Sequence, residues 1–136
     1  MGINIKAVWQ GNLKQGNGKL NIENSGLNDV NFKPFFAKSD GTFTNPEELL
    51  ASAHATCYAM TLGYILSESG ITADSLESNV SLVIENNVVQ SSNINLQAKI
   101  PGIDDEQFQQ FAIKAKEMCT IGNALSVEIT LKASLV

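Results

Sequence analysis

Asn45-Pro-Glu-Glu-Leu-Leu-Ala-Ser-Ala-His-Ala-Thr-Cys57 begins a long helix and carries one of the two cysteines in this 136-residue chain. Asparagine is a good N-cap, proline is favoured at the first helical position, and acidic residues complement the positive end of the helix dipole. We therefore predict a helix from Asn45 to about Ser69, with Gly70 as its C-cap. Small residues on several of its faces favour a central, buried position.

Alternation of apolar and polar residues predicts strands on both sides of this helix. The strands fall at 3–9 (half-buried), 19–23, 76–85, 88–100 and 125–135, with turns at Asn17-Gly18 and Asn86-Asn87. Residues 24–44 are expected to form a long ordered loop with one short strand. A second helix begins at Asp104. This order predicts one α+β domain over residues 1–136, with helices packed on a largely antiparallel sheet.

The composition excludes several classes of partner. A hydrophobic content of 43% and a charged content of 17% are those of a globular protein. The formal net charge is −5, and the nine basic residues are all lysines, spread too thinly for a nucleic-acid-binding surface. The N-terminus lacks the pattern of a signal peptide, and no apolar run approaches the length of a membrane span. We expect a cytoplasmic protein with no membrane or nucleic-acid partner.

Cys57 and Cys119 have two interpretations. A free cysteine is most often a small buried hydrophobic residue, whereas a reactive one needs a thiolate-stabilising environment. His54, one turn before Cys57, would either lower the pKa of the thiol, serve as a base, or simply pack in the helix. Two cysteines and one histidine fall short of a structural zinc site, so we expect no metal and no bound cofactor.

Several segments together resemble one known family. They are Thr44 to Cys57, Pro101-Gly-Ile-Asp104, Ala115-Lys-Glu-Met-Cys119 and Val127-Glu-Ile-Thr-Leu131. In this order they resemble the osmotically inducible protein C (OsmC) family, which is related to the organic hydroperoxide resistance (Ohr) proteins. The resemblance spans nearly the whole chain. It implies an intertwined homodimer in which sheets pack around a long central helix and a second helix.

The resemblance also implies a thiol-dependent peroxidase that reduces organic hydroperoxides and hydrogen peroxide. Cys57 falls on the position of the cysteine that attacks the peroxide and becomes a sulfenic acid. Cys119 falls on the position of the resolving cysteine, which condenses with it to a disulfide. An external dithiol of the dihydrolipoyl type would then reduce the disulfide.

This chain departs from the family pattern at a charged position. The family holds its peroxidatic cysteine as a thiolate with an arginine, which pairs with the glutamate that matches Glu47. The chain has no arginine, and the matching position falls near Ala37 and Lys38. Lys38 is the expected replacement, as a point charge without the rigid fork of arginine. Thr120 also stands where the family commonly has proline. The alternative function is a non-catalytic dimer that binds a small apolar ligand or senses oxidation.

Overall fold

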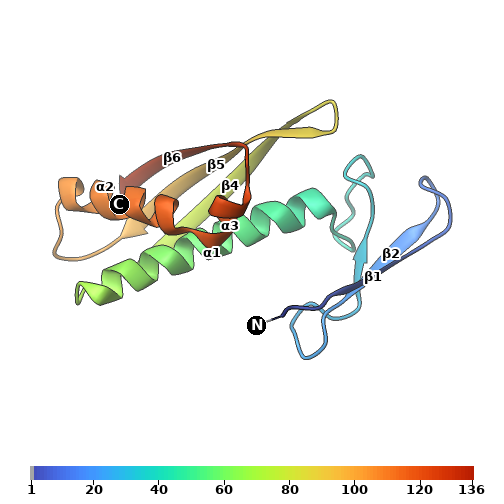
Figure 1. The fold of residues 1–136 in the computed structure, drawn as a ribbon, viewed down its shortest axis with the longest axis horizontal. Helices are drawn as coiled ribbons and strands as arrows, with labels where there is room; N and C mark the ends of the chain where they lie inside the picture. The colour runs from blue at the N-terminus through green and yellow to red at the C-terminus, as the bar shows by residue number, and fades with distance from the viewer. Residues whose placement is uncertain (1) are drawn as a thin grey trace. The chain divides into compact units, whose positions relative to one another are not determined.

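The computed structural model describes residues 2–136 and shows an α+β protein with two sheets and three helices among those residues (Figure 1). The chain divides into two compact units, Met1–Leu49 and Leu50–Val136. The boundary between the units falls inside the long helix α1 (Pro46–Glu68). The predicted helix is therefore confirmed, and it contributes residues to both units.

The N-terminal unit contains an antiparallel sheet of three strands. Strand β1 (Lys6–Gln10) pairs with β2 (Asn17–Asn21), which pairs with β3 (Val30–Phe32). The prediction of a turn at Asn17-Gly18 is wrong, because both residues lie in β2 and residues 11–16 make the turn. Gly18 lies against the ring of Phe32, and a Cβ there would overlap that ring unless it moved. The strand predicted at 3–9 is present as β1 from Lys6 onward, but its predicted half-burial is wrong, because β1 is exposed apart from Trp9.

Local hydrogen bonds explain where α1 begins. The N–H of Glu48 donates to Oδ1 of Asn45 at 2.7 Å, and the Thr44 hydroxyl donates to the Glu48 carboxylate at 3.0 Å. These contacts satisfy an N–H group that has no partner inside the helix. The helix ends where Gly70 takes a φ of 71°, a left-handed conformation that glycine adopts at little cost. Both predicted caps are confirmed.

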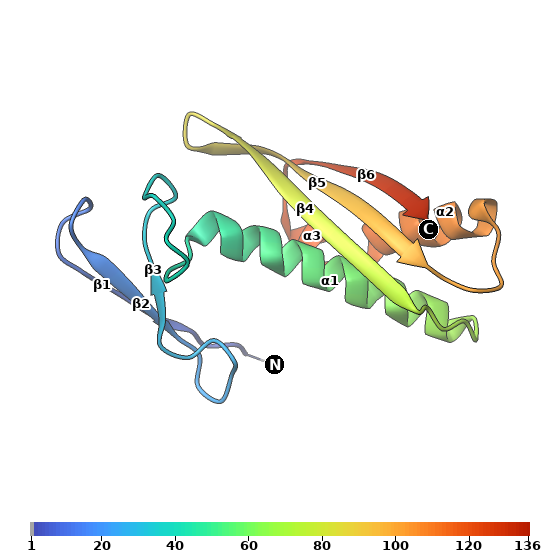
Figure 2. The ribbon, with the colours of Figure 1, turned by 180° about the vertical axis from the view of Figure 1, so that it is seen from behind.

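The C-terminal unit is built on a second sheet, with the order β4-β5-β6 (Figure 2). Strands β4 (Ser75–Glu85) and β5 (Val88–Lys99) form the predicted hairpin, and Asn86 and Asn87 have φ values of 52° and 62° in its turn. Strand β6 (Glu128–Leu135) lies parallel to β5. A parallel pair needs a long crossover connection. Helices α2 (Asp105–Met118) and α3 (Thr120–Ala124) form that connection.

One face of this sheet packs against the helices to form the core. Alternate residues of β5 point into the core, while their neighbours along the strand are less buried or exposed. Helix α1 contributes one buried face, with Tyr58 and Leu62 fully buried, and α2 contributes Phe108, Ala112 and Ala115. Other faces of α1 are open in the single chain, where Met60 is 75% exposed and Tyr64 is 57% exposed. The expected all-round burial of α1 is therefore not seen in the single chain.

Helix α1 is the one described helix that is long and apolar enough to cross a membrane, by length and composition alone. The prediction concerned uninterrupted apolar runs, whereas α1 meets this test by its average composition and contains polar residues such as His54 and Thr61. However, the core helix of a globular protein meets the same test, and a face of α1 packs in the core of the C-terminal unit. The helix is thus weak evidence for a membrane span.

Candidate active site

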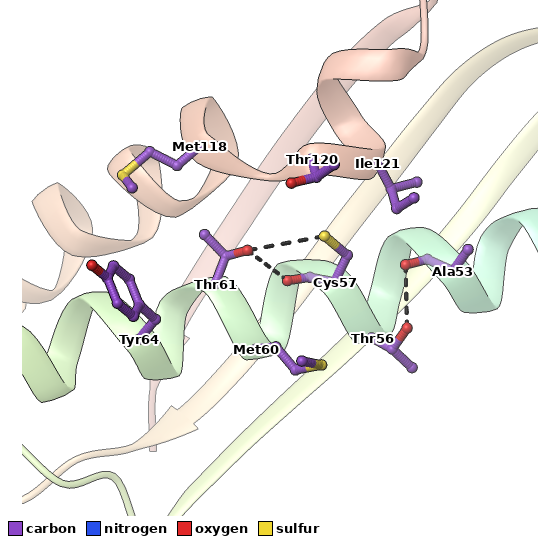
Figure 3. Close-up of a pocket in the computed structure, with 9 residues that line it drawn as sticks. All are labelled: Ala53, Thr56, Cys57, Met60, Thr61, Tyr64, Met118, Thr120 and Ile121. Atoms are coloured by element: carbon purple, nitrogen blue, oxygen red, sulfur yellow. Dashed lines mark hydrogen bonds between the residues drawn. The ribbon is translucent and has the colours of Figure 1, made fainter. Parts of the chain in front are cut away.

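A pocket of about 610 Å³ opens beside Cys57 in the C-terminal unit (Figure 3). Two segments form it, the middle of α1 and the junction between α2 and α3. Its lining is mostly apolar and consists of Ala53, Thr56, Cys57, Met60, Thr61, Tyr64, Met118, Thr120 and Ile121. Such a pocket suits an apolar ligand with one polar reacting group.

Cys57 is half-buried, and its sulfur points from α1 toward the α2–α3 junction (Figure 3). The hydroxyl of Thr61, one turn further along α1, lies 4.0 Å from the sulfur and donates to the Cys57 carbonyl at 2.8 Å. The sulfur therefore combines access from the pocket with polar neighbours.

Cys119 is fully buried and lies where α2 ends and α3 begins. It caps α3, because its sulfur accepts a hydrogen bond from the N–H of Gly122 at 3.5 Å. The Cys119 thiol also lies near enough to Cys57 to lower the pKa of the Cys57 thiol. Both cysteines are free thiols, and the fold brings them together from distant parts of the sequence.

The surroundings make the two thiols differ in acidity. Burial acts to raise the pKa of Cys57, but hydrogen bonds from the Ile121 backbone, the Cys119 thiol, Thr61 and the Thr120 backbone hold that pKa below its ordinary value. The pKa of Cys119 is raised, first by burial and then by its role as donor to Cys57. Cys57 therefore ionises first, while Cys119 keeps its proton.

His54 does not point into the pocket from α1, since it is only 1% exposed and is not among the pocket-lining residues. Its Nδ1 lies 2.6 Å from the hydroxyl of Ser92 on β5, which is also fully buried. Burial lowers the pKa of His54, which keeps the ring neutral near pH 7. Of the three interpretations of His54, the packed histidine describes its surroundings best.

Lys38 and Glu47 lie in the N-terminal unit. Lys38 is exposed in the segment between β3 and α1, where it lines a small pocket with Lys33 and Phe43. Glu47 lies in the first turn of α1, and its Oε2 is buried without a hydrogen-bond partner among residues 2–136. Among residues 2–136 there is one ion pair, between Lys19 and Asp29. Lys38 and Glu47 are thus not paired within their unit.

Sequence reasoning missed the residues that surround the two sulfurs. The backbone groups of Thr120 and Ile121 contact Cys57, and any residue type supplies a backbone N–H. Ser92 was missed because nothing in its strand distinguishes it from the other serines of that segment. No group of three or more potential metal ligands is present among residues 2–136.

Comparison with known proteins places this site in a family context. Residues 39–134 match the family model described as OsmC-like protein. The peroxiredoxin OsmC of Escherichia coli (strain K12) is 32% identical over 136 residues, covering 96% of this chain and 94% of the relative. The organic hydroperoxide resistance protein OhrB of Bacillus subtilis is 31% identical over 102 residues, covering 73% of this chain and 75% of the relative.

Solved structures share the fold. An OsmC-like protein from Mycoplasma pneumoniae superposes with a TM-score of 0.82 at 18% identity, covering 100% of this chain and 98% of that one. The structure of B. subtilis OhrB gives a TM-score of 0.68 at 24% identity, with 98% of each chain covered. These two structural similarities establish the fold. The match to the family model and the identity to the E. coli relative establish family membership. The chain belongs to the OsmC-like protein family.

Proposed function

We propose that this protein is a thiol-dependent peroxidase in which Cys57 attacks the peroxide and Cys119 resolves the product. The observation that carries the proposal is the presence of two neighbouring free thiols that differ in acidity and access. Cys57 faces the apolar pocket, while Cys119 is fully buried behind it. The more accessible and more acidic thiol suits the attack on the peroxide, and the buried thiol suits the later attack on the oxidised sulfur.

The proposed reaction has two steps. The Cys57 thiolate attacks one oxygen of the peroxide, the O–O bond breaks, and the leaving alkoxide takes a proton to become an alcohol. The sulfenic acid left on Cys57 is then attacked by the Cys119 sulfur. The S–S bond forms, the S–O bond breaks, and water leaves. An external dithiol such as a dihydrolipoyl group returns both cysteines to thiols by two exchange steps.

The thiolate of Cys57 would be supported without arginine. The backbone groups of Ile121 and Thr120 and the thiol of Cys119 already lower its pKa. Lys38 and Glu47 would assist as a cation and its acceptor, because the buried Oε2 of Glu47 has no partner in its own unit. Such a pair would act through charge, since lysine offers a compact ammonium group and not a fork.

The relatives support this proposal and suggest a substrate class. Two of them are named a peroxiredoxin and an organic hydroperoxide resistance protein. The apolar pocket suits the organic part of a hydroperoxide better than hydrogen peroxide alone. We also infer a cytoplasmic homodimer, as expected for the family. Exposed Ile3, Ile5, Phe35 and Phe36 in the N-terminal unit would be covered by the second copy.

Turnover with two peroxides tests the proposal. Consumption of cumene hydroperoxide and hydrogen peroxide is followed in the presence of a dihydrolipoyl dithiol, for the wild type and for Cys57→Ser. We expect dithiol-dependent turnover, faster with cumene hydroperoxide, that disappears in Cys57→Ser. Equal consumption by both proteins would refute a peroxidase centred on Cys57.

The absence of arginine favours one other function, a non-catalytic dimer that uses the same pocket for a small apolar ligand. The same samples distinguish the two functions. Saturable binding of cumyl alcohol by both proteins, with no peroxide consumed by either, would establish the binding function in place of the peroxidase.

A further inference from the structure

His54 joins three elements of the C-terminal unit through buried contacts. The ring belongs to α1, and its Nδ1 lies 2.6 Å from the hydroxyl of Ser92 on β5. Both residues are almost completely buried, at 1% and 0% exposure. This hydrogen bond limits rotation of the ring. If the ring turned, both buried groups would lose their hydrogen-bond partner, and no water could replace it.

The other side of the ring meets the segment that carries Cys119. A Cβ added to Gly122 would lie 3.2 Å from Nε2 of His54 and 3.5 Å from Cβ of Cys119. The ring and Cys119 therefore approach the same side of Gly122, and a Cβ there would require the ring or the turn to shift by a few tenths of an ångström. Gly122 in turn donates its N–H to the Cys119 sulfur at 3.5 Å. The position of the Cys119–Gly122 turn thus depends on the position of the ring.

We propose that His54, held by Ser92, is a positioning residue that places the Cys119–Gly122 turn for attack of Cys119 on oxidised Cys57. This role rests on the proposed function. Disulfide formation requires the Cys119 sulfur to approach along the line of the S–O bond that breaks. A misplacement of about 1 Å costs about a hundredfold in rate for reactions that depend on such alignment. Attack of Cys57 on the peroxide does not need the Cys119 sulfur as a nucleophile, although the turn supplies hydrogen bonds that lower the Cys57 pKa.

Three variants disturb the contact from different sides. His54→Asn keeps an amide near the place of Nδ1, and so the bond to Ser92, but is too short to reach Gly122. His54→Gln reaches toward the place of Nε2 and is the conservative variant. Gly122→Ala pushes against the ring with a new Cβ. Gly63→Ala, in α1, is the matched control, because its Cβ would meet only Leu76 at an ordinary 4.0 Å.

The test separates the two chemical steps by rapid mixing. Loss of the Cys57 thiol and formation of the Cys57–Cys119 disulfide are followed after mixing with cumene hydroperoxide, by quenching and mass spectrometry. For His54→Asn and Gly122→Ala we expect disulfide formation to slow by about tenfold to a hundredfold relative to the control. Oxidation of Cys57 should slow less, because the turn affects that step only through the hydrogen bonds that lower the Cys57 pKa. His54→Gln should recover part of the loss. An equal slowing of both steps would indicate a merely structural defect and would overturn the proposal, as would unchanged disulfide formation.

A second oxidant keeps this test independent of peroxidase activity. Diamide accepts the Cys57 thiolate at its N=N bond, and attack by Cys119 then closes the disulfide and releases the reduced hydrazine. If the wild type reduces no hydroperoxide, the proposed function fails, and the diamide reaction still measures closure. Slower closure in His54→Asn and Gly122→Ala supports the positioning role, and closure at the rate of Gly63→Ala overturns it.

Discussion

Replacing Cys119 tests whether its thiol stabilises the Cys57 thiolate. The Cys119→Ala and Cys119→Ser variants each leave Cys57 as the one cysteine, so a thiolate signal belongs to a single group. Alanine removes the donor that contacts the Cys57 sulfur, whereas serine supplies a hydroxyl donor of similar size. The pair therefore differs mainly in one hydrogen bond to a charged atom.

The expected effect follows from the strength of that bond. A hydrogen bond to a charged group contributes about 1.5–3 kcal/mol, and the lower end is appropriate here because Cys57 is half-buried and partly solvated. Since about 1.4 kcal/mol corresponds to a factor of ten, the ratio of thiolate to thiol should be about tenfold lower in Cys119→Ala than in Cys119→Ser.

The assay is the ultraviolet absorbance of the thiolate across a pH series below the ordinary pKa of cysteine. Thermal unfolding of both variants verifies that each is folded, because Cys119 is fully buried and its replacement affects packing. Equal thiolate fractions in the two variants would refute the hydrogen-bonding argument and leave backbone groups as the main source of the lowered pKa.

Three further predictions concern the core, the buried histidine and the lysine. Phe108→Ala should lower the free energy of unfolding in urea by about 3–5 kcal/mol, because the ring is fully buried, and a loss below about 1 kcal/mol would contradict the described core. The free energy of unfolding should fall as the pH drops below 6.5, because histidine in the unfolded chain gains a proton there while the lowered pKa of buried His54 keeps the folded ring neutral. The free energy of unfolding of His54→Gln should depend less on pH, and an identical pH profile for the two proteins would contradict this prediction. Lys38→Ala should slow oxidation of Cys57 by cumene hydroperoxide, and an unchanged rate would exclude Lys38 as the replacement for arginine.

Local signals in the sequence predicted much of the fold. The N-cap at Asn45, the C-cap at Gly70 and the Asn86-Asn87 turn all depend on residues close together in the chain. The turn at Asn17-Gly18 was predicted by the same reasoning and is wrong. There the glycine serves a tertiary contact with Phe32, which no short-range pattern encodes.

Strand direction was beyond the sequence patterns. Alternation identifies the last strand, but it does not say that β6 pairs with β5 in parallel, because alternation is the same for either direction. The exposure of β1 was also missed. Ile3, Ile5, Ala7 and Trp9 alternate as in a half-buried strand, yet Ile3 is 76% exposed and Ile5 is 58% exposed just before β1.

The sequence pointed to the two cysteines of the candidate site but not to the way they are held. The resemblance placed Cys57 and Cys119 on two catalytic positions, and the fold brings their thiols together. The contact between His54 and Ser92 and the backbone groups of Thr120 and Ile121 depend on tertiary structure alone. The roles of Glu47 and Lys38, which both lie in the N-terminal unit, stay predictions.

A single-turnover titration tests the central claim most directly. Reduced protein is mixed anaerobically with one equivalent of cumene hydroperoxide per chain, and the products are identified by peptide mass spectrometry. The account predicts one equivalent of cumyl alcohol, loss of both thiols, and a disulfide between Cys57 and Cys119. Recovery of intact peroxide with both thiols still free would contradict it.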